Sequence, residues 1–353
     1  MEGPCFEVSP FILRNFNLNG TEDTIAGPCL MNGLRIKEFN DDVSYLFSSD
    51  NFIIVSFYSG KVIFETIESF MQSEKDKCSM QAHKNPIRVG IYNENRGRIF
   101  TGSSKGFISE IDPLKQKVLT KFHNGQSSIS CLAFAGSDLL IAGDDEGGLK
   151  IYDVRDSFKR FRFPDLKKLH CDQIKSILIN DYRKSIATAG ADGVISIIDS
   201  RKWKCATQTE NFAEEINDCC IDNLTLNKGK ESVIAATDSG AINFFEWGYW
   251  GQVSKRALYA TSMVNSLCVS DNKIYCGLEN GSIAAFSDSF EEIYTGVDSI
   301  EKLVVAQYSE GESLIFTSYE RTIGILPVNQ LRSKLNEQCD EPGIVDNFYK
   351  DLD

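Results

Sequence analysis

The chain repeats one pattern of hydrophobic and polar positions seven times. Each copy begins with a short apolar run that ends in small residues, passes through a turn, and resumes with alternating apolar and polar positions. Two such runs separated by a tight turn predict a β-hairpin. The seven copies are residues 53–66, 99–112, 140–153, 186–199, 233–246, 274–287 and 315–328.

The turn position of the pattern gives the period of the repeat. Six copies hold Gly at their eighth position, where a hairpin turn needs a positive φ, and the last copy holds Thr. These residues are 46, 41, 46, 47, 41 and 41 positions apart: Gly60, Gly106, Gly147, Gly193, Gly240, Gly281 and Thr322. A period of this length fits one four-stranded blade, and blades bury both faces only when several pack radially. The pattern therefore predicts an all-β fold, a seven-bladed β-propeller.

The third strand of each predicted blade resembles that of the WD-repeat family, which usually ends this strand with Trp-Asp. No copy has Trp there, and the position holds Glu65, Ile111, Tyr152, Ile198, Phe245, Phe286 and Pro327, or Leu326 if one residue is deleted. The Asp is kept as Asp112, Asp153 and Asp199, with Glu246 as a near match. The resemblance implies a WD40-type propeller with divergent repeats.

The three histidines of the chain fit the same family pattern. The three are His83, His123 and His170, and they precede the Asp that ends the third strand of their blades by 29, 30 and 29 residues, respectively. In WD blades this His lies in the loop that enters the blade and bonds towards an Asp of the hairpin turn, for which Asp192 and Asp145 are the candidates. Equivalent positions in three successive blades keep the imidazoles apart, so we expect a structural role and neither catalysis nor metal binding.

The ends of the chain suggest how the ring closes. The last hairpin is followed by too few residues for an outer strand, so we expect the N-terminal side to supply it, with Arg35–Phe39 as first choice and Phe11–Phe16 as the alternative. Residues 1–34 are then an extension, 35–332 the propeller and 333–353 an acidic tail that does not order alone. In that tail Phe348, Tyr349 and Leu352 are either incidental or a motif that docks in a partner's groove.

Composition narrows the classes of function. The chain has 37 basic and 50 acidic residues, a net charge of −13, which argues against a general affinity for nucleic acid or anionic membranes. No apolar run is long enough for a membrane span, and the acidic N-terminus does not resemble a secretory signal, so we expect an intracellular protein. Eleven dispersed cysteines without a CxxC pair indicate reduced thiols and no zinc site. No nucleophile–base arrangement or phosphate-binding loop indicates an enzyme or a cofactor.

One stretch runs against the acidic composition. Residues 155–170 contain six basic side chains against two acidic ones, with three Phe interleaved: Arg155, Lys159, Arg160, Arg162, Lys167 and Lys168. Alternating Arg and Phe is also typical of an outer propeller strand with one face inward. The stretch is therefore either an ordinary outer strand or a contact strip for RNA phosphates or an acidic protein.

Two further resemblances bear on function. Residues 152–155 and 198–201 resemble the WDxR motif of WD proteins that act as substrate receptors of cullin-type ubiquitin ligases, without the Trp. Residues 243–256 and the terminal DNFYKDL resemble blade five and the tail of one WD-repeat subfamily, whose members are nuclear or nucleolar proteins needed for ribosomal RNA processing and ribosome production. The matching blade-five positions are Phe245, Trp247, Trp250, Gly251 and Arg256. The second resemblance implies a non-catalytic scaffold that contacts protein or RNA of pre-ribosomal particles, and we expect the chain to be a monomer in isolation.

Overall fold

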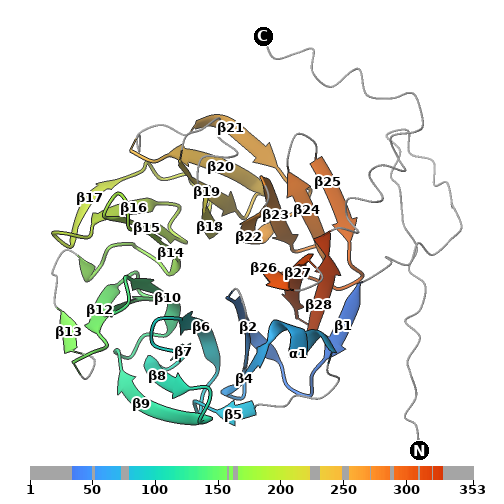
Figure 1. Cartoon of the computed structure of the whole chain (residues 1–353). Coiled ribbons are helices and arrows are strands. Elements are labelled where there is room, and N and C mark those ends of the chain that lie inside the picture. Colours follow the sequence, from blue (N-terminus) through green and yellow to red (C-terminus); the bar gives the residue numbers. More distant parts are fainter. Residues whose placement is uncertain are drawn as a thin grey trace, which may run out of the picture.

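Seven four-stranded antiparallel sheets form a ring in the computed structural model of the chain (Figure 1). The structure describes residues 34–49, 52–72, 79–156, 159–161, 166–222, 231–248, 254–270, 272–286, 290–308, 311–319 and 321–328. In each blade the first strand is innermost and the fourth outermost. The seven-bladed propeller predicted from the hairpin spacing is confirmed.

The strands of the first three blades follow one another along the chain. Blade one consists of β2 (Val43–Ser48), β3 (Phe52–Phe57), β4 (Lys61–Thr66) and β5 (Ser79–Gln81), with helix α1 (Ile67–Gln72) between the last two. Blade two consists of β6 (Ile87–Asn93), β7 (Arg98–Ser103), β8 (Phe107–Asp112) and β9 (Lys117–His123). Blade three consists of β10 (Ile129–Ala135), β11 (Leu139–Asp144), β12 (Leu149–Asp153) and β13 (Lys159–Phe161).

The remaining blades repeat this order until the ring closes. Blade four consists of β14 (Ile174–Asn180), β15 (Ser185–Gly190), β16 (Ile195–Asp199) and β17 (Lys204–Gln208). Blade five consists of β18 (Ile216–Asp222), β19 (Ser232–Thr237), β20 (Ala241–Glu246) and β21 (Ser254–Tyr259). Blade six consists of β22 (Val264–Ser270), β23 (Lys273–Leu278), β24 (Ser282–Phe286) and β25 (Phe290–Tyr294). Blade seven consists of β26 (Ile300–Tyr308), β27 (Gly311–Ser318), β28 (Thr322–Pro327) and β1 (Arg35–Glu38).

The glycine turns have the conformation that the sequence predicts. All six eighth-position glycines have φ between +71° and +85°. In blade three a Cβ added to Gly147 would lie 2.2 Å from the carbonyl oxygen of His170, so the turn has no room for a side chain. The turns and the loops that enter the next blade therefore pack closely on one face of the ring, which we call the hairpin face. The turns at the other ends of the strands form the reverse face.

The hairpin of blade seven has a turn of the same length as the others but lies one residue earlier than the eighth-position pattern predicts, with Thr317 paired to Ile323 as Ala189 is to Ile195 in blade four. Thr322 is already the first residue of β28, and the positive φ falls on Arg321 at +63°. Leu326 then pairs with Leu314 and is buried, as the residues at the Trp position of other blades are. Of the two residues that the sequence offers for that position, Leu326 is therefore correct and Pro327 is wrong, although the hairpin is shifted by one residue and has no deletion.

The N-terminal strand closes the ring. Strand β1 pairs antiparallel with β28 from Arg35 opposite Ile325 to Glu38 opposite Thr322, which confirms the first choice from the sequence. Phe39 follows β1, is buried, and its ring centroid lies 5.4 Å from that of Phe57 in blade one. The extension up to residue 33, including the alternative strand Phe11–Phe16, lies outside the described residues.

The hydrophobic core lies between neighbouring blades and not inside single blades. One cluster joins blade one to blade seven, and includes Leu46 and Val55 from the first and Ile315 and Ile323 from the second. Other clusters join blades two and three, three and four, four and five, five and six, and six and seven. Each sheet thus buries both faces by stacking on its neighbours, as expected for a radial repeat.

Candidate functional site

A ring of β-bulges surrounds the centre of the hairpin face. In every blade the register of the innermost strand shifts by one residue just after the strand begins. A bulge leaves one residue unpaired and redirects its side chain, and bulges often occur beside binding sites. The seven bulged residues are all polar: Ser44, Arg88, Ser130, Lys175, Asn217, Asn265 and Glu301.

Five of these bulged residues line a cavity at the centre of the ring. The cavity has a volume of about 370 Å³ and receives side chains from blades one, four, five, six and seven. Tyr58 and Tyr319 from two hairpin turns also line it, and they are 51% and 73% exposed. An aromatic rim above a polar cavity is an arrangement suited to holding a side chain or peptide of a partner.

An ion pair joins two of the five charged residues that line the cavity. Lys302 Nζ of blade seven lies 2.7 Å from Asp218 Oδ2 of blade five. The same carboxylate oxygen accepts hydrogen bonds from the hydroxyl of Ser266 and the backbone NH of Leu267 in blade six, each at 3.1 Å. Burial lowers the pKa of Lys302, but the Asp218 carboxylate more than offsets this, so the pKa lies above its ordinary value. The network connects three blades and leaves Lys302 protonated.

The buried thiols are not suited to nucleophilic chemistry. Burial raises the pKa of Cys131 to about 12, and burial followed by the Asp218 charge raises that of Cys219 and Cys220. Among the described residues, no group of three or more His, Cys, Asp or Glu side chains is placed to hold a metal ion. The cavity therefore offers hydrogen bonding, one fixed ion pair and aromatic contact.

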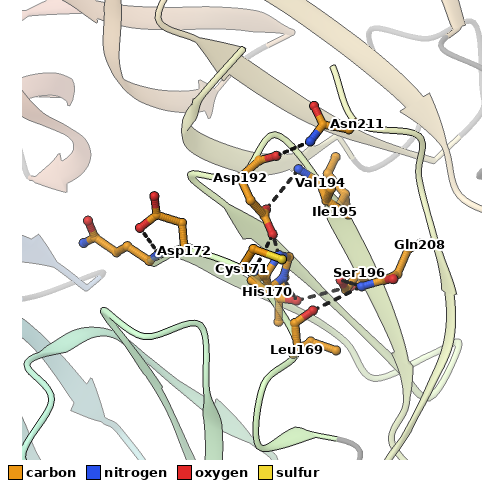
Figure 2. Close-up of polar contacts among 12 residues, drawn as sticks. Leu169, His170, Cys171, Asp172, Asp192, Val194, Ile195, Ser196, Gln208 and Asn211 are labelled. Atoms are coloured by element: carbon orange, nitrogen blue, oxygen red, sulfur yellow. Dashed lines mark hydrogen bonds and ion pairs between the residues drawn. The ribbon is translucent and has the colours of Figure 1, made fainter. Parts of the chain in front are cut away.

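His170 connects two neighbouring blades beside this face (Figure 2). Its backbone NH donates to the carbonyl of Gly147 in blade three, while its ring reaches into blade four. Nδ1 lies 3.0 Å from Asp192 Oδ1, and Nε2 lies 2.9 Å from the hydroxyl of Thr188. Burial lowers the pKa of His170 although Asp192 opposes this, so the neutral ring donates from Nδ1 to the carboxylate and accepts from Thr188.

His83 makes the corresponding connection between blades one and two without an acidic partner. Its NH donates to Gly60 O, and its Nε2 lies 2.9 Å from the hydroxyl of Thr101. The turn position that holds Asp192 in blade four holds Lys105 in blade two, and Nδ1 of His83 has no hydrogen-bond partner in the described part of the chain. Burial, then the charge of Lys121, lowers the pKa of His83 to about 4.

His123 does not take the place that its spacing predicts. It is the last residue of β9, opposite Phe107, and the strict alternation of that strand leaves it exposed with its ring 4.6 Å from the Phe107 ring. The next residue, Asn124, is buried, donates its NH to Gly106 O and accepts a hydrogen bond from the hydroxyl of Tyr152. Asp145, the expected partner of His123, instead lies 3.7 Å from Arg88.

The two Asp-x-Arg motifs form matching structures on the reverse face. Asp153 accepts bonds from the backbone NH, Nε and Nη2 of Arg155 at 2.9, 3.0 and 2.7 Å. Asp199 accepts the same three bonds from Arg201 at 2.9, 3.0 and 2.9 Å, which hold the pKa of Asp199 at about 2. Asp112 has no such Arg and instead accepts from the NH of Lys115 at 3.1 Å and lies 3.2 Å from Arg98.

The basic stretch of residues 155–170 is divided between the two faces. Arg155 lies on the reverse face, β13 runs outward of β12, and the exposed Lys167 and Lys168 lie in the loop on the hairpin face. Leu166 and Leu169 beside these lysines are buried and anchor the loop. The side chains of Lys159, Arg160 and Arg162 lie outside the described residues. The described bases thus do not gather at one point.

The blade-five signature contributes to the core. Phe245 and Trp247 are buried in the cluster between blades four and five, and Trp247 Nε1 donates to the hydroxyl of Ser185 at 3.1 Å. Trp250, Gly251 and the side chain of Arg256 lie outside the described residues, as do Phe348, Tyr349 and Leu352 of the tail. The described part of the signature therefore stabilises a blade interface.

The lining of the cavity is the part that sequence reasoning missed. Its signal is faint: one polar residue, second in each innermost strand, directly after a β-branched apolar residue. Within the described ranges, no helix has the length and apolar character needed to span a membrane.

Comparisons with known proteins agree with the repeat assignment. No protein-family model matches the chain. The curated relatives include WD repeat-containing protein 55 homolog of Drosophila persimilis, 25% identical over 210 residues, which are 59% of this chain and 40% of that protein. WD repeat-containing protein 55 of Rattus norvegicus is 22% identical over 73% of this chain and 66% of its own length. The protein of the same name from Arabidopsis thaliana is 25% identical over 58% of this chain and 56% of its own length.

These relatives confirm the WD-repeat resemblance predicted from the sequence. The chain spans between 40% and 66% of the length of the three proteins. Among solved structures, the computationally designed Ika8 protein has a TM-score of 0.62 at 15% identity, covering 81% of this chain and 83% of that one, which shows a shared fold.

Proposed function

We propose that this WD-repeat propeller, a relative of WD repeat-containing protein 55, is a scaffold for protein components of pre-ribosomal particles in ribosome biogenesis and ribosomal RNA processing. The resemblance of residues 243–256 and of the terminal DNFYKDL to that subfamily supports the role. A nuclear or nucleolar location and a monomeric state in isolation are parts of the same proposal.

The observation that carries the scaffold role is the cavity on the hairpin face. Its bulged amides and its two exposed tyrosines present hydrogen-bonding groups and aromatic surface at the point where five blades meet. The Asp218–Lys302 pair in its wall is internally satisfied, so this part of the wall is preorganised for recognition. Such a surface supports the binding of a partner's side chains without any chemical step.

Depletion of the protein tests the proposal, with rescue by variants. We expect precursor ribosomal RNA to accumulate on depletion and the wild-type chain to restore processing. A Tyr58→Ala, Tyr319→Ala double variant should restore it only partly, because exposed aromatic groups contribute to binding and little to stability. Leu114→Ala, which truncates an even more exposed apolar side chain on the reverse face, is the control. Normal precursor processing after depletion would remove the proposal.

The alternative is a substrate receptor of a cullin-type ubiquitin ligase. One observation favours it: Arg155 and Arg201 are held in the same way on successive blades of the reverse face and are 62% and 70% exposed. Co-purification of the ligase adaptor with the wild type, and its loss on Arg155→Ala with Arg201→Ala, would support this role. Absence of the adaptor from the wild-type complex would end it.

A further inference from the structure

The reverse face of blade four carries a compact group of basic residues. The turn between β14 and β15 and the turn between β16 and β17 are joined by a hydrogen bond from Ser200 NH to Lys184 O at 3.0 Å. We define the basic corner as the exposed residues of these turns other than Asp181, together with Lys204 at the start of β17: Tyr182, Arg183, Lys184, Arg201, Lys202 and Lys204. Five cations thus lie at one edge of a chain whose net charge is −13.

Two of the five cations are held by carboxylates, and three lysines extend beyond them. Arg201 is bound to Asp199 as described, and Arg183 Nε lies 2.5 Å from Glu231 of blade five. No ion pair of Lys184, Lys202 or Lys204 is found among the described residues, and all three are exposed. The five cations outnumber the three carboxylates beside them, Asp181, Asp199 and Glu231, so the corner keeps a net positive charge, which is what a polyanion recognises.

An exposed aromatic ring stands among these cations. Tyr182 is 92% exposed, more than any other large apolar or aromatic side chain in the described part of the chain. Its turn is rigid: Arg183 NH donates to Asn180 Oδ1 at 2.9 Å, Asn180 Nδ2 donates to Glu231 Oε1 at 2.5 Å, and Lys184 has a φ of +53°. These contacts fix the backbone that presents the ring, so the exposed ring is accessible to a base from outside the chain.

We propose that the basic corner binds single-stranded RNA, with a base stacked on Tyr182 and backbone phosphates at Lys184, Lys202 and Lys204. Basic side chains that follow the backbone, together with an aromatic platform for a base, are the usual means of binding a single strand. An acidic polypeptide would also be attracted by the lysines, but it has no planar group that requires the exposed ring. The proposal deepens the scaffold function and rests on it, because it names the RNA that a pre-ribosomal scaffold would contact.

Binding of the full-length chain to labelled oligouridine RNA tests the proposal. We expect a Lys184→Glu, Lys202→Glu, Lys204→Glu variant to raise the Kd at least about tenfold and to lower the slope of log Kd against log salt by about 2, as loss of three phosphate contacts predicts. Tyr182→Ala should raise the Kd about tenfold at unchanged slope, because stacking is not electrostatic. Lys61→Glu, Lys84→Glu, Lys105→Glu makes the same charge change on the hairpin face and should leave the Kd within about twofold.

Four results would overturn the proposal. They are absence of RNA binding, equal loss in the control variant, equal affinity for double-stranded RNA, and stronger binding of polyglutamate than of RNA at equal charge. The triple-lysine variant must melt at the wild-type temperature, since a lower melting temperature would show that the substitutions affect folding. In that case the RNA affinity of Tyr182→Ala alone decides whether the corner binds RNA. If the chain does not bind RNA but its depletion causes precursor ribosomal RNA to accumulate, RNA binding at the basic corner is wrong and the scaffold function stands. If the chain binds RNA but depletion leaves precursor processing normal, the scaffold function is wrong and RNA binding at the corner stands.

Discussion

The neutral, buried His83 should make the propeller lose stability in mild acid. Its side chain is 1% exposed, and burial lowers its pKa to about 4 from an ordinary value of 6.5. In the unfolded chain the imidazole binds a proton as the pH falls below 6.5, while in the folded chain it stays neutral until about pH 4. The unfolded state therefore gains protons first, and the free energy of unfolding falls between these two pH values.

The size of the effect follows from the two pKa values. A difference of one unit corresponds to about 1.4 kcal/mol, so the full loss is about 3 kcal/mol at pH 4 and below, and about 2 kcal/mol is lost by pH 5. His170 adds to the loss in the wild type because burial lowers its pKa too. The contribution of His83 is isolated by comparison with His83→Gln, which keeps a donor for Thr101 but does not titrate.

Urea denaturation at pH 7.5 and pH 5.0 measures both proteins. At pH 7.5 the variant should be less stable than the wild type by roughly 1 kcal/mol, since it replaces one buried hydrogen bond with a poorer one. Between the two pH values the wild type should lose about 2 kcal/mol more than the variant. His123→Gln is the control, because that ring is exposed, and it should keep the pH dependence of the wild type. An equal loss in the wild type and His83→Gln would refute the reasoning.

Three further predictions concern the seam, the cavity and the tail. Phe39→Ala should lower the free energy of unfolding by about 3–5 kcal/mol in chemical denaturation, because Phe39 packs where the ring closes, whereas the partly exposed Leu119→Ala should change it by less than about 1 kcal/mol. Asp218→Asn should lower it by about 2–3 kcal/mol, since it leaves an ammonium in the cavity wall without its carboxylate; an unchanged denaturation midpoint would contradict the network described. Phe348→Ala with Leu352→Ala should weaken a partner complex in co-purification without lowering the melting temperature, and a lower temperature would show that the tail packs on the propeller.

The fold was predictable from sequence because its signal is local and repeated. A hairpin turn with φ near +75° accepts Gly far better than other residues, so glycines 41–47 residues apart indicate blades even without the family's Trp. Arg321 shows the limit of this signal, because a non-glycine can hold the same conformation when the strands on both sides are well paired.

Positions that depend on side-chain direction were harder to predict. The His-to-Asp interval in blade three is one residue longer than in the other two, and in a strand one residue moves a side chain to the other face. His123 is therefore exposed, and Asn124 is buried in its place. The cavity was missed for a related reason: a bulge breaks the alternation from which inward and outward positions are inferred.

Affinity purification of the tagged full-length chain, with identification of the bound proteins and RNAs, decides between the scaffold of pre-ribosomal particles and the ligase receptor. We expect ribosome-assembly proteins and precursor ribosomal RNA to be enriched over a control in which Tyr58 and Tyr319 are replaced by Ala. Recovery of a cullin-type ligase adaptor, with no precursor ribosomal RNA and no assembly protein above the control, would contradict it.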